Sequence, residues 1–345
     1  MRNITGYKVH WVSGNGDAVL SKNSTIYYYN YDENNFTKIY KLKYQKLFLG
    51  IINRGPIERF LRGGVHHVIK INDNYVIFFD RRIFTIKEEK INSVFEIETC
   101  KRPLNVCYNA EEGSIYWGDY VAGRERLPIN IYRSINLGKD WEIVYTFSPG
   151  CVRHIHNIIY DKFRKHYWIL TGDTDAESGI WKTRDFTTIK PVFSGNQKYR
   201  ATSLIPLKEG LIIPTDTEVM RNYIQYYSYL DEVLTNVKEI PGSSISADRV
   251  NGFSFVGTMV EPSSVNKAQN SNLYVSQNNE AWFELLSLKR DILPVKYFQY
   301  PAISIPKYED NYSADRYYFN IRNTKHYNYS GVLIFKKDEI LEIIK

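Results

Sequence analysis

Groups of short strand-like segments recur along this chain at a spacing of roughly 40–50 residues, a period typical of propeller blades. The clearest group contains four runs rich in β-branched and aromatic residues: Cys151–Tyr160, His166–Thr171, Gly179–Thr183 and Ile189–Phe193. Turn-forming Gly, Asp and Asn residues separate the runs. No apolar period of 3.6 residues continues beyond two turns, so the sequence predicts an all-β fold.

Seven such groups can be counted, in residues 6–43, 64–98, 102–147, 151–193, 199–240, 246–289 and 295–345. The first group looks one strand short, with Lys8–Val12, Ser24–Tyr31 and Thr37–Leu42. The last group ends in Glu339–Lys345, a final strand in this interpretation, although residues 337–345 also suit a short helix. No Pro-, Ser- or Gly-rich linker separates the groups, which predicts one domain over residues 1–345. We therefore expect a seven-bladed β-propeller of four-stranded antiparallel blades, or six blades if the first group only completes the last.

Composition narrows the classes of function. Aromatic residues make up 15% of the chain, which favours strands. The formal net charge is +7, but Lys and Arg are scattered, which suits an acidic ligand better than a nucleic acid. The three cysteines contain no C-x-x-C spacing, and no stretch has the ~18 apolar residues of a membrane span. The N-terminal stretch lacks the plan of a signal peptide, so we expect a cytoplasmic protein, or a secreted one if a leader has been removed.

One loop carries a recognisable motif, Ser134-Ile-Asn136-Leu-Gly138-Lys-Asp-Trp141. The Ser134 and Asn136 side chains can hydrogen-bond the backbone of their own hairpin, Gly138 can supply a positive φ, and Trp141 can pack between sheets. Related segments follow at Thr183-Arg-Asp185-Phe186 and at Ser276-Gln-Asn278 with Trp282. We expect the motif residues to be structural.

The motif resembles the Asp-box, or BNR repeat, of sialidase-like propellers, S-x-D-x-G-x-x-W, with Asn136 in place of the usual Asp. Segments such as RHIHNIIYD and TGDTDAESGIW also resemble BNR-repeat proteins labelled glycosyl hydrolase, and the resemblance covers about residues 60–290. It implies a propeller that acts on carbohydrate. The F/Y-R-I-P signature of sialidases is absent, which makes a classical sialidase unexpected.

In a propeller blade, the start of the innermost strand and the end of the second strand lie on one face. The predicted innermost strands begin with basic and imidazole side chains, namely His66, His67, Arg102, Arg153, His154, His156 and Arg200. The second strands end with Asp119, Tyr120, Asp173, Asp175, Asp216 and Glu218. An Asp in such a place often only caps a turn, and a His in a β core is often only packed. Gathered at one face, however, they suggest a site.

The chemistry of these groups suggests their roles. Neutral imidazoles can act as general bases, or can hold a divalent metal where a carboxylate joins them, and Arg can pair bidentately with the carboxylate of an acidic sugar. We assign catalysis to His154, His156, Asp173, Asp216 and Tyr120. We assign substrate binding to Arg200, Arg102, Arg153, His66, His67, Asp119, Asp175 and Glu218. The metal ligands are left open: no cofactor is certain, and a divalent metal held by His and Asp side chains at the mouth of the channel is the alternative.

These assignments predict a carbohydrate-active enzyme, either a glycoside hydrolase or a polysaccharide lyase, acting on an acidic surface or capsular-type glycan. Hydrolysis needs two carboxylates about 5–10 Å apart, for which Asp173 and Asp216 are the candidates. Elimination would use His154, His156, Arg200 and Tyr120. The alternative is a noncatalytic propeller that binds a glycan or a protein at the same place, because the fold alone does not define the function.

Overall fold

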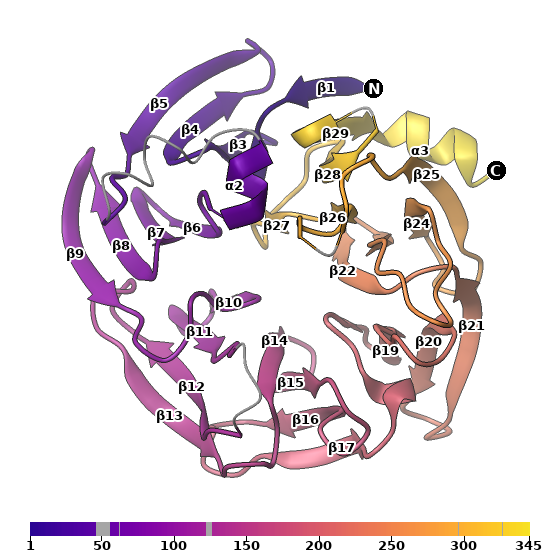
Figure 1. Ribbon diagram of the computed structural model, residues 1–345. Helices are drawn as coiled ribbons and strands as arrows, with labels where there is room; N and C mark the ends of the chain where they lie inside the picture. The colour runs from indigo at the N-terminus through magenta and orange to yellow at the C-terminus, as the bar shows by residue number, and fades with distance from the viewer. Residues whose placement is uncertain (46–55, 62, 122–125, 296, 326) are drawn as a thin grey trace. The chain divides into compact units, whose positions relative to one another are not determined.

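Figure 1 shows the computed structural model, which describes residues 1–45, 56–61, 63–121, 126–295, 297–325 and 327–345. The chain forms two compact units. Unit 1 comprises residues 1–70, 245–263 and 267–345, and unit 2 comprises residues 71–244 and 264–266.

Four antiparallel sheets make up unit 2, but the first strand of the first sheet, β6, belongs to unit 1 in all but its last residue, Ile71. Each sheet takes four strands in chain order, as Figure 1 shows. The first two sheets are β6 (His67–Ile71), β7 (Asn74–Phe79), β8 (Arg82–Lys87), β9 (Lys90–Glu96), and β10 (Val106–Asn109), β11 (Ser114–Gly118), β12 (Ile129–Ser134), β13 (Glu142–Phe147). The other two are β14 (His154–Asp161), β15 (His166–Gly172), β16 (Gly179–Thr183), β17 (Lys190–Ser194), and β18 (Ile205–Pro206), β19 (Gly210–Pro214), β20 (Asn222–Ser228), β21 (Leu234–Ile240). A 3₁₀ helix, η1, spans Gln197–Tyr199.

Unit 1 contains three sheets and two short helices, α2 (Pro56–Leu61) and α3 (Lys337–Ile343). One sheet is β22 (Ser244–Val250), β23 (Phe253–Thr258), β24 (Asn270–Ser276) and β25 (Phe283–Lys289). A second is β2 (Lys8–Val12), β3 (Ala18–Lys22), β4 (Thr25–Asn30) and β5 (Asn35–Lys41), to which β27 (Lys307–Tyr308) adds a short parallel edge. The third runs in the order β1 (Arg2–Thr5), β29 (Tyr327–Lys336), β28 (Arg316–Thr324), β26 (Ala302–Ser304). Seven sheets confirm the predicted seven-bladed β-propeller.

The structure corrects the prediction at both ends of the chain. The first group is not short of a strand, because Ala18–Lys22 forms β3 and pairs with β2 and β4. The predicted final strand at Glu339–Lys345 is wrong, because α3 occupies most of it and buries Ile340. The place of that strand is taken by β1, whose Ile4 pairs with Val332 of β29. The N-terminal strand therefore completes the last sheet, and the first group still forms a sheet of its own.

Apolar side chains from neighbouring sheets form the core of each unit. In unit 2, Tyr116 of β11 packs against Tyr167 of β15 and stacks on Phe186, which follows β16. In unit 1, Phe255 is fully buried and packs against Tyr317 and Phe319. Flat side chains fill the space between sheets, which explains the high aromatic content.

The loop between β12 and β13 has the hydrogen bonds predicted from its motif. Gly138 N donates to Ser134 Oγ at 2.9 Å, and the positive φ lies at both Leu137 and Gly138. Asn136 Oδ1 accepts from Asp140 N at 3.0 Å, while its Nδ2 donates to Asp140 Oδ2 at 2.8 Å. A carboxylate at position 136 could not make the second bond, which explains Asn in place of Asp. Trp141 donates from Nε1 to Gly138 O and packs near Phe78, Phe95 and Trp117.

The two related loops use a similar bond, which comes from the third residue after the Thr or Ser instead of the fourth. Phe186 N donates to Thr183 Oγ1 and Asn279 N donates to Ser276 Oγ, each at 2.9 Å. Trp282 Nε1 donates to Asn279 O at 3.3 Å. In all three loops the Ser or Thr side chain accepts a backbone hydrogen bond that stabilises the hairpin, so the motif residues are structural.

Candidate active site

The candidate site in unit 2 is built on the hairpin of β14 and β15. His154 and His156 lie two residues apart on β14, a spacing that places side chains on the same face of a strand. The β14–β15 register shifts between Ile155 and Asn157, so His156 sits in a bulge that re-aims its ring. His154 pairs with Gly172, and Asp173 is the next residue along the chain. The sequence therefore brings both imidazoles to one carboxylate.

The three side chains meet in a compact cluster, the His–Asp cluster of His154, His156 and Asp173. The two Nε2 atoms are 3.2 Å apart, and Asp173 Oδ1 lies 3.1 Å from Nε2 of His154 and 3.8 Å from Nε2 of His156. Both histidines are buried, with 4% and 2% of their surface exposed. Gly172 leaves room for the cluster, because a Cβ there would lie 2.7 Å from His156 Cε1.

The protonation of the cluster follows from its partners. His156 Nδ1 lies 2.9 Å from the carbonyl oxygen of Ala201, so this nitrogen carries a hydrogen and donates it. Burial lowers the pKa of His156, and a charge on His154 would lower it further, so its ring is neutral at neutral pH. Burial alone would raise the pKa of Asp173, but interactions led by the hydrogen bond with His154 outweigh it and the pKa lies well below its ordinary value. Asp173 is therefore a carboxylate and not a proton donor.

Two arginines adjoin the cluster. Arg153 Nη1 donates to Asp173 Oδ2 at 2.7 Å. Arg200 is buried, with its Nη2 3.6 Å from Asp173 Oδ1 and its Nε 3.7 Å from Asp216 Oδ2. Its third contact, with Glu218 Oε1 at 3.4 Å, reaches a side chain that is 47% exposed. Arg200 thus contacts one buried carboxylate, Asp216, and two that are partly exposed, Asp173 and Glu218.

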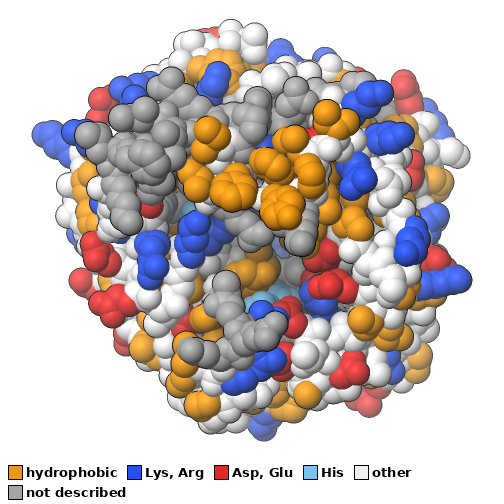
Figure 2. Space-filling model, viewed as in Figure 1, with side chains coloured by type: hydrophobic (Ala, Val, Ile, Leu, Met, Phe, Trp, Pro, Cys, Tyr) orange, Lys and Arg blue, Asp and Glu red, His pale blue; other side chains and the backbone are white. Residues whose placement is uncertain are grey.

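Tyr120 lies against the cluster. Its ring stacks on His154, with centroids 4.2 Å apart and planes 29° apart, and lies 6.4 Å from the ring of His156. Figure 2 shows pale blue histidine atoms beside acidic and basic side chains on the face in view.

Two other predicted site residues lie in unit 2 with their carboxylates engaged in local structure. Asp119 binds Asn130 N at 3.0 Å and the hydroxyl of Thr99, and burial raises its pKa. Asp175 Oδ1 accepts from Gln197 N at 3.0 Å, at the start of η1. Arg102 is partly exposed. His66 and His67 belong to unit 1, and so lie in a different unit from the cluster.

Sequence reasoning missed three contributors. Gln197 is buried and donates to the carbonyl of Asp173 at 2.6 Å. Ala201 holds the His156 ring through its carbonyl, and Gly172 provides space. In the sequence Gly172 could be interpreted only as a turn residue. The role of Ala201 could not be inferred, because every residue has a backbone carbonyl.

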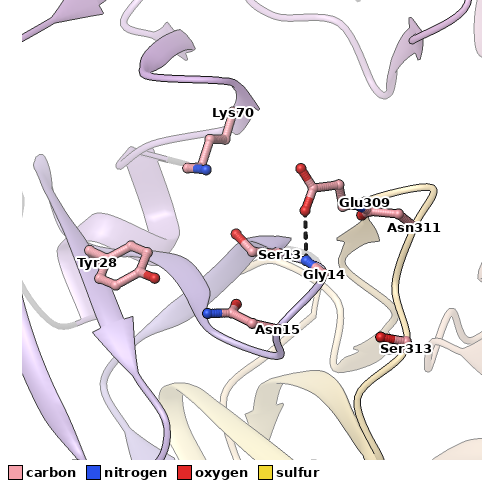
Figure 3. A pocket seen from close by; sticks show the side chains of 8 residues that line it. All are labelled: Ser13, Gly14, Asn15, Tyr28, Lys70, Glu309, Asn311 and Ser313. Atoms are coloured by element: carbon pink, nitrogen blue, oxygen red, sulfur yellow. Dashed lines mark hydrogen bonds between the residues drawn. The ribbon is translucent and has the colours of Figure 1, made fainter.

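Unit 1 has a separate polar pocket of about 490 Å³ (Figure 3). Its lining comes from the β2–β3 turn, β4, β6 and the segment after β27: Ser13, Gly14, Asn15, Tyr28, Lys70, Glu309, Asn311 and Ser313. Gly14 N donates to Glu309 Oε2 at 2.6 Å. The pocket offers hydrogen-bonding groups but not the paired imidazoles found in unit 2, where we place the candidate chemistry.

No family model matches the chain, and no curated protein matches its sequence. Among solved structures, the chain is similar to one in the crystal structure of a mitotic checkpoint complex, with a TM-score of 0.58 and 7% identity over 97% of this chain and 93% of that one. It is also similar to the WD40 β-propeller domain of Doa1, with a TM-score of 0.56 and 10% identity over 98% of this chain and 97% of that one. The protein is thus a seven-bladed β-propeller whose structural neighbours include WD40 propellers. At such low identity the likeness shows the fold alone, and the sialidase-like resemblance stays a prediction. Among the described residues, no helix is long and apolar enough to cross a membrane.

Proposed function

We propose that the protein is a carbohydrate-active enzyme that acts on an acidic glycan at the His–Asp cluster and its neighbours Tyr120 and Arg200. The observation that carries the proposal is the meeting of two buried imidazoles, an aromatic hydroxyl residue and a guanidinium group at one place. These groups suit an acidic sugar, because a guanidinium cation can bind the sugar carboxylate and neutral side chains can transfer protons at the neighbouring carbon and oxygen atoms.

Arg200 supplies the cation for substrate recognition. Two of its three carboxylate partners, Asp173 and Asp216, are buried or largely so, but Glu218 is about half exposed. Glu218 contacts the guanidinium group only at 3.4 Å and borders solvent, so it is the partner that an incoming carboxylate can replace. Glu218 therefore marks the position that a uronic-acid carboxylate would take.

The set of side chains at the cluster favours elimination over two-carboxylate hydrolysis. Hydrolysis would use Asp173 as its ionised carboxylate and would leave the two imidazoles and Tyr120 without a role, whereas elimination uses them. In elimination, a base removes the proton next to the sugar carboxylate, the C4–O bond breaks, a C4–C5 double bond forms, and the leaving oxygen takes up a proton. A neutral imidazole and Tyr120 are the groups that can accept and return these protons.

Replacing His156 with alanine is expected to lower kcat/KM on an acidic polysaccharide by about 10²–10⁴-fold, the usual contribution of a proton-transfer group. The assay follows the ultraviolet absorbance of unsaturated products and the appearance of reducing ends in parallel. The matched control is His166→Ala, a histidine of the same sheet that contacts Asp161 instead of the cluster. Reducing ends without absorbance would show hydrolysis. An inactive wild-type protein that still binds the glycan would instead indicate a binding propeller.

Replacing Glu218 with glutamine is expected to lower KM for the same glycan by about two- to fivefold, because the substrate carboxylate no longer competes with the Glu218 carboxylate for Arg200. The effect should disappear with a neutral glycan of similar size, and kcat should change little. A higher KM in Glu218→Gln would contradict the proposed carboxylate position and would leave the role of His156 open to its own test.

A further inference from the structure

We propose that the His–Asp cluster is a binding site for one divalent cation of the zinc class, with His154 Nε2, His156 Nε2 and Asp173 Oδ1 as ligands. The inference does not depend on glycan turnover, because it concerns binding of the ion alone.

The spacing of the three atoms fits a tetrahedral ion. Two ligand atoms of a tetrahedral zinc site lie about 3.3–3.5 Å apart when the metal–ligand bonds are about 2.0–2.1 Å. The three edges of the triangle in this protein are 3.1, 3.2 and 3.8 Å. The atoms therefore form one face of such a tetrahedron, with a fourth position left for water or another ligand.

Without an ion, hydrogen bonds among the three proposed ligand atoms cannot give each atom a good partner at the same time. Because His156 Nδ1 gives its hydrogen to Ala201, the Nε2 lone pair of the neutral ring faces His154 and the Asp173 carboxylate. A hydrogen on His154 Nε2 can serve only one of its two close neighbours at full strength. Hydrogens on both Nε2 atoms would oppose each other across 3.2 Å. A cation satisfies all three atoms at once.

The surrounding contacts are those of an outer ligand shell. Metal-bound histidines usually donate their other ring nitrogen to a carbonyl or carboxylate, as His156 does to Ala201. Arg153 binds Oδ2 of Asp173 and so leaves Oδ1 to face the imidazoles. Gly172 permits the close approach of the His156 ring. His156 and Asp173 are thus held by hydrogen bonds before an ion arrives, and the ring of His154 is held by its stack on Tyr120.

Charge and ligand type indicate which ion. Three carboxylates, of Asp173, Asp216 and Glu218, contact the two guanidinium groups of Arg153 and Arg200, which leaves one negative charge in excess. Two imidazoles and one carboxylate suit Zn²⁺ and its neighbours in the first transition row, whereas Mg²⁺ and Ca²⁺ prefer oxygen ligands alone. With the ion bound, His154 and His156 would serve as ligands, so the imidazole part of the proton transfer proposed above belongs to the ion-free cluster and Tyr120 would be the proton-transfer group of the ion-bound one.

The test uses Co²⁺ and Zn²⁺ as probes of the full chain after treatment with a chelator. We expect one equivalent of Co²⁺ to bind and to give the strong visible absorption of a four-coordinate ion, and Zn²⁺ to displace it. His154→Ala, His156→Ala and Asp173→Asn should each weaken binding more than about 100-fold, because loss of an outer-shell partner alone costs about 10–100-fold. The control His166→Ala should bind like the wild type.

Each other outcome contradicts the proposal. Absence of stoichiometric binding to the wild type, binding that survives all three ligand variants, or binding lost in His166→Ala would place the ion elsewhere or nowhere. Circular dichroism checks that the variants fold, and Asp173→Asn, which conserves shape, decides the matter if either alanine variant unfolds. Because the readout is spectroscopic, it is independent of whether any glycan is cleaved.

Discussion

Replacing Asp291 with alanine is expected to lower the free energy of unfolding by about 3–5 kcal/mol, the usual cost of removing one partner of a buried ion pair. Asp291 Oδ2 accepts from Arg59 Nη1 of α2 at 2.5 Å, and both side chains are buried, with 6% and 7% exposed. The Asp291→Ala variant would leave the Arg59 guanidinium buried without this carboxylate. Denaturant unfolding followed by tryptophan fluorescence measures the change.

The matched control is Glu239→Ala, which removes an ion pair with Arg221 at 3.4 Å in which the side chains are 51% and 71% exposed. That variant should lie within about 0.5 kcal/mol of the wild type. The double variant Arg59→Met with Asp291→Leu should recover much of the loss, because it removes both charges together. A loss below about 1 kcal/mol in Asp291→Ala would show that α2 is not held by this pair.

Figure 2 shows hydrophobic side chains at the surface where Figure 1 places α2, and Phe60 of this helix is exposed.

Replacing Gly172 with alanine is expected to weaken both catalysis and Co²⁺ binding by about 100-fold, the scale set by a displacement of about 1 Å at a reacting group. The new Cβ would lie 2.7 Å from Cε1 of His156 and 3.1 Å from Cγ of Arg200, so these side chains must move. Overpacking should also lower the free energy of unfolding by about 1–3 kcal/mol. Kinetics, Co²⁺ titration and denaturant unfolding measure the three effects.

Gly179 provides the control for this variant. It lies on β16 of the same sheet, where a Cβ would come 2.8 Å from Nε1 of Trp181 and would not touch the cluster. Gly179→Ala should therefore lose a similar amount of stability but keep ion binding. If both variants lost binding equally, the effect of Gly172→Ala would reflect general destabilisation and not the position of His156.

Much of the fold could be predicted because strands such as Asn74–Phe79 and Arg82–Lys87 carry continuous apolar runs between clear turns. The errors arose where local pattern was weak. Arg2–Thr5 has one buried residue, Ile4, and its partner strand lies at the other end of the chain, so pairing could not be inferred from nearby sequence. Lys337–Ile343 has an apolar pattern that suits either a strand or a helix, and the burial of Ile340 decided for the helix.

The site was predictable in part for a similar reason. The alternation of side chains along a strand placed His154 and His156 together, and the hairpin brought Asp173 to them. The sequence did not show which carboxylates were free to act. Asp119 directly follows β11 as Asp173 follows β15, and Asp175 lies two residues further on, but the oxygens of Asp119 and Asp175 bind local backbone groups at Asn130 and Gln197. Such differences depend on loop geometry that propensity does not encode.

The pairing of β1 with β29 has a consequence for how the chain is made. During synthesis β1 emerges before β29, so Ile4 must wait for Val332 while the sheets that lie between them in sequence are produced. Until then the sheet of β26, β28 and β29 lacks its edge strand β1. The unpaired backbone groups of β29 can then pair with a strand of another chain. The ribosome-bound and newly released states are therefore the ones most exposed to aggregation. A bulky fusion placed directly before Arg2 would act on this step of folding before it affected the finished molecule.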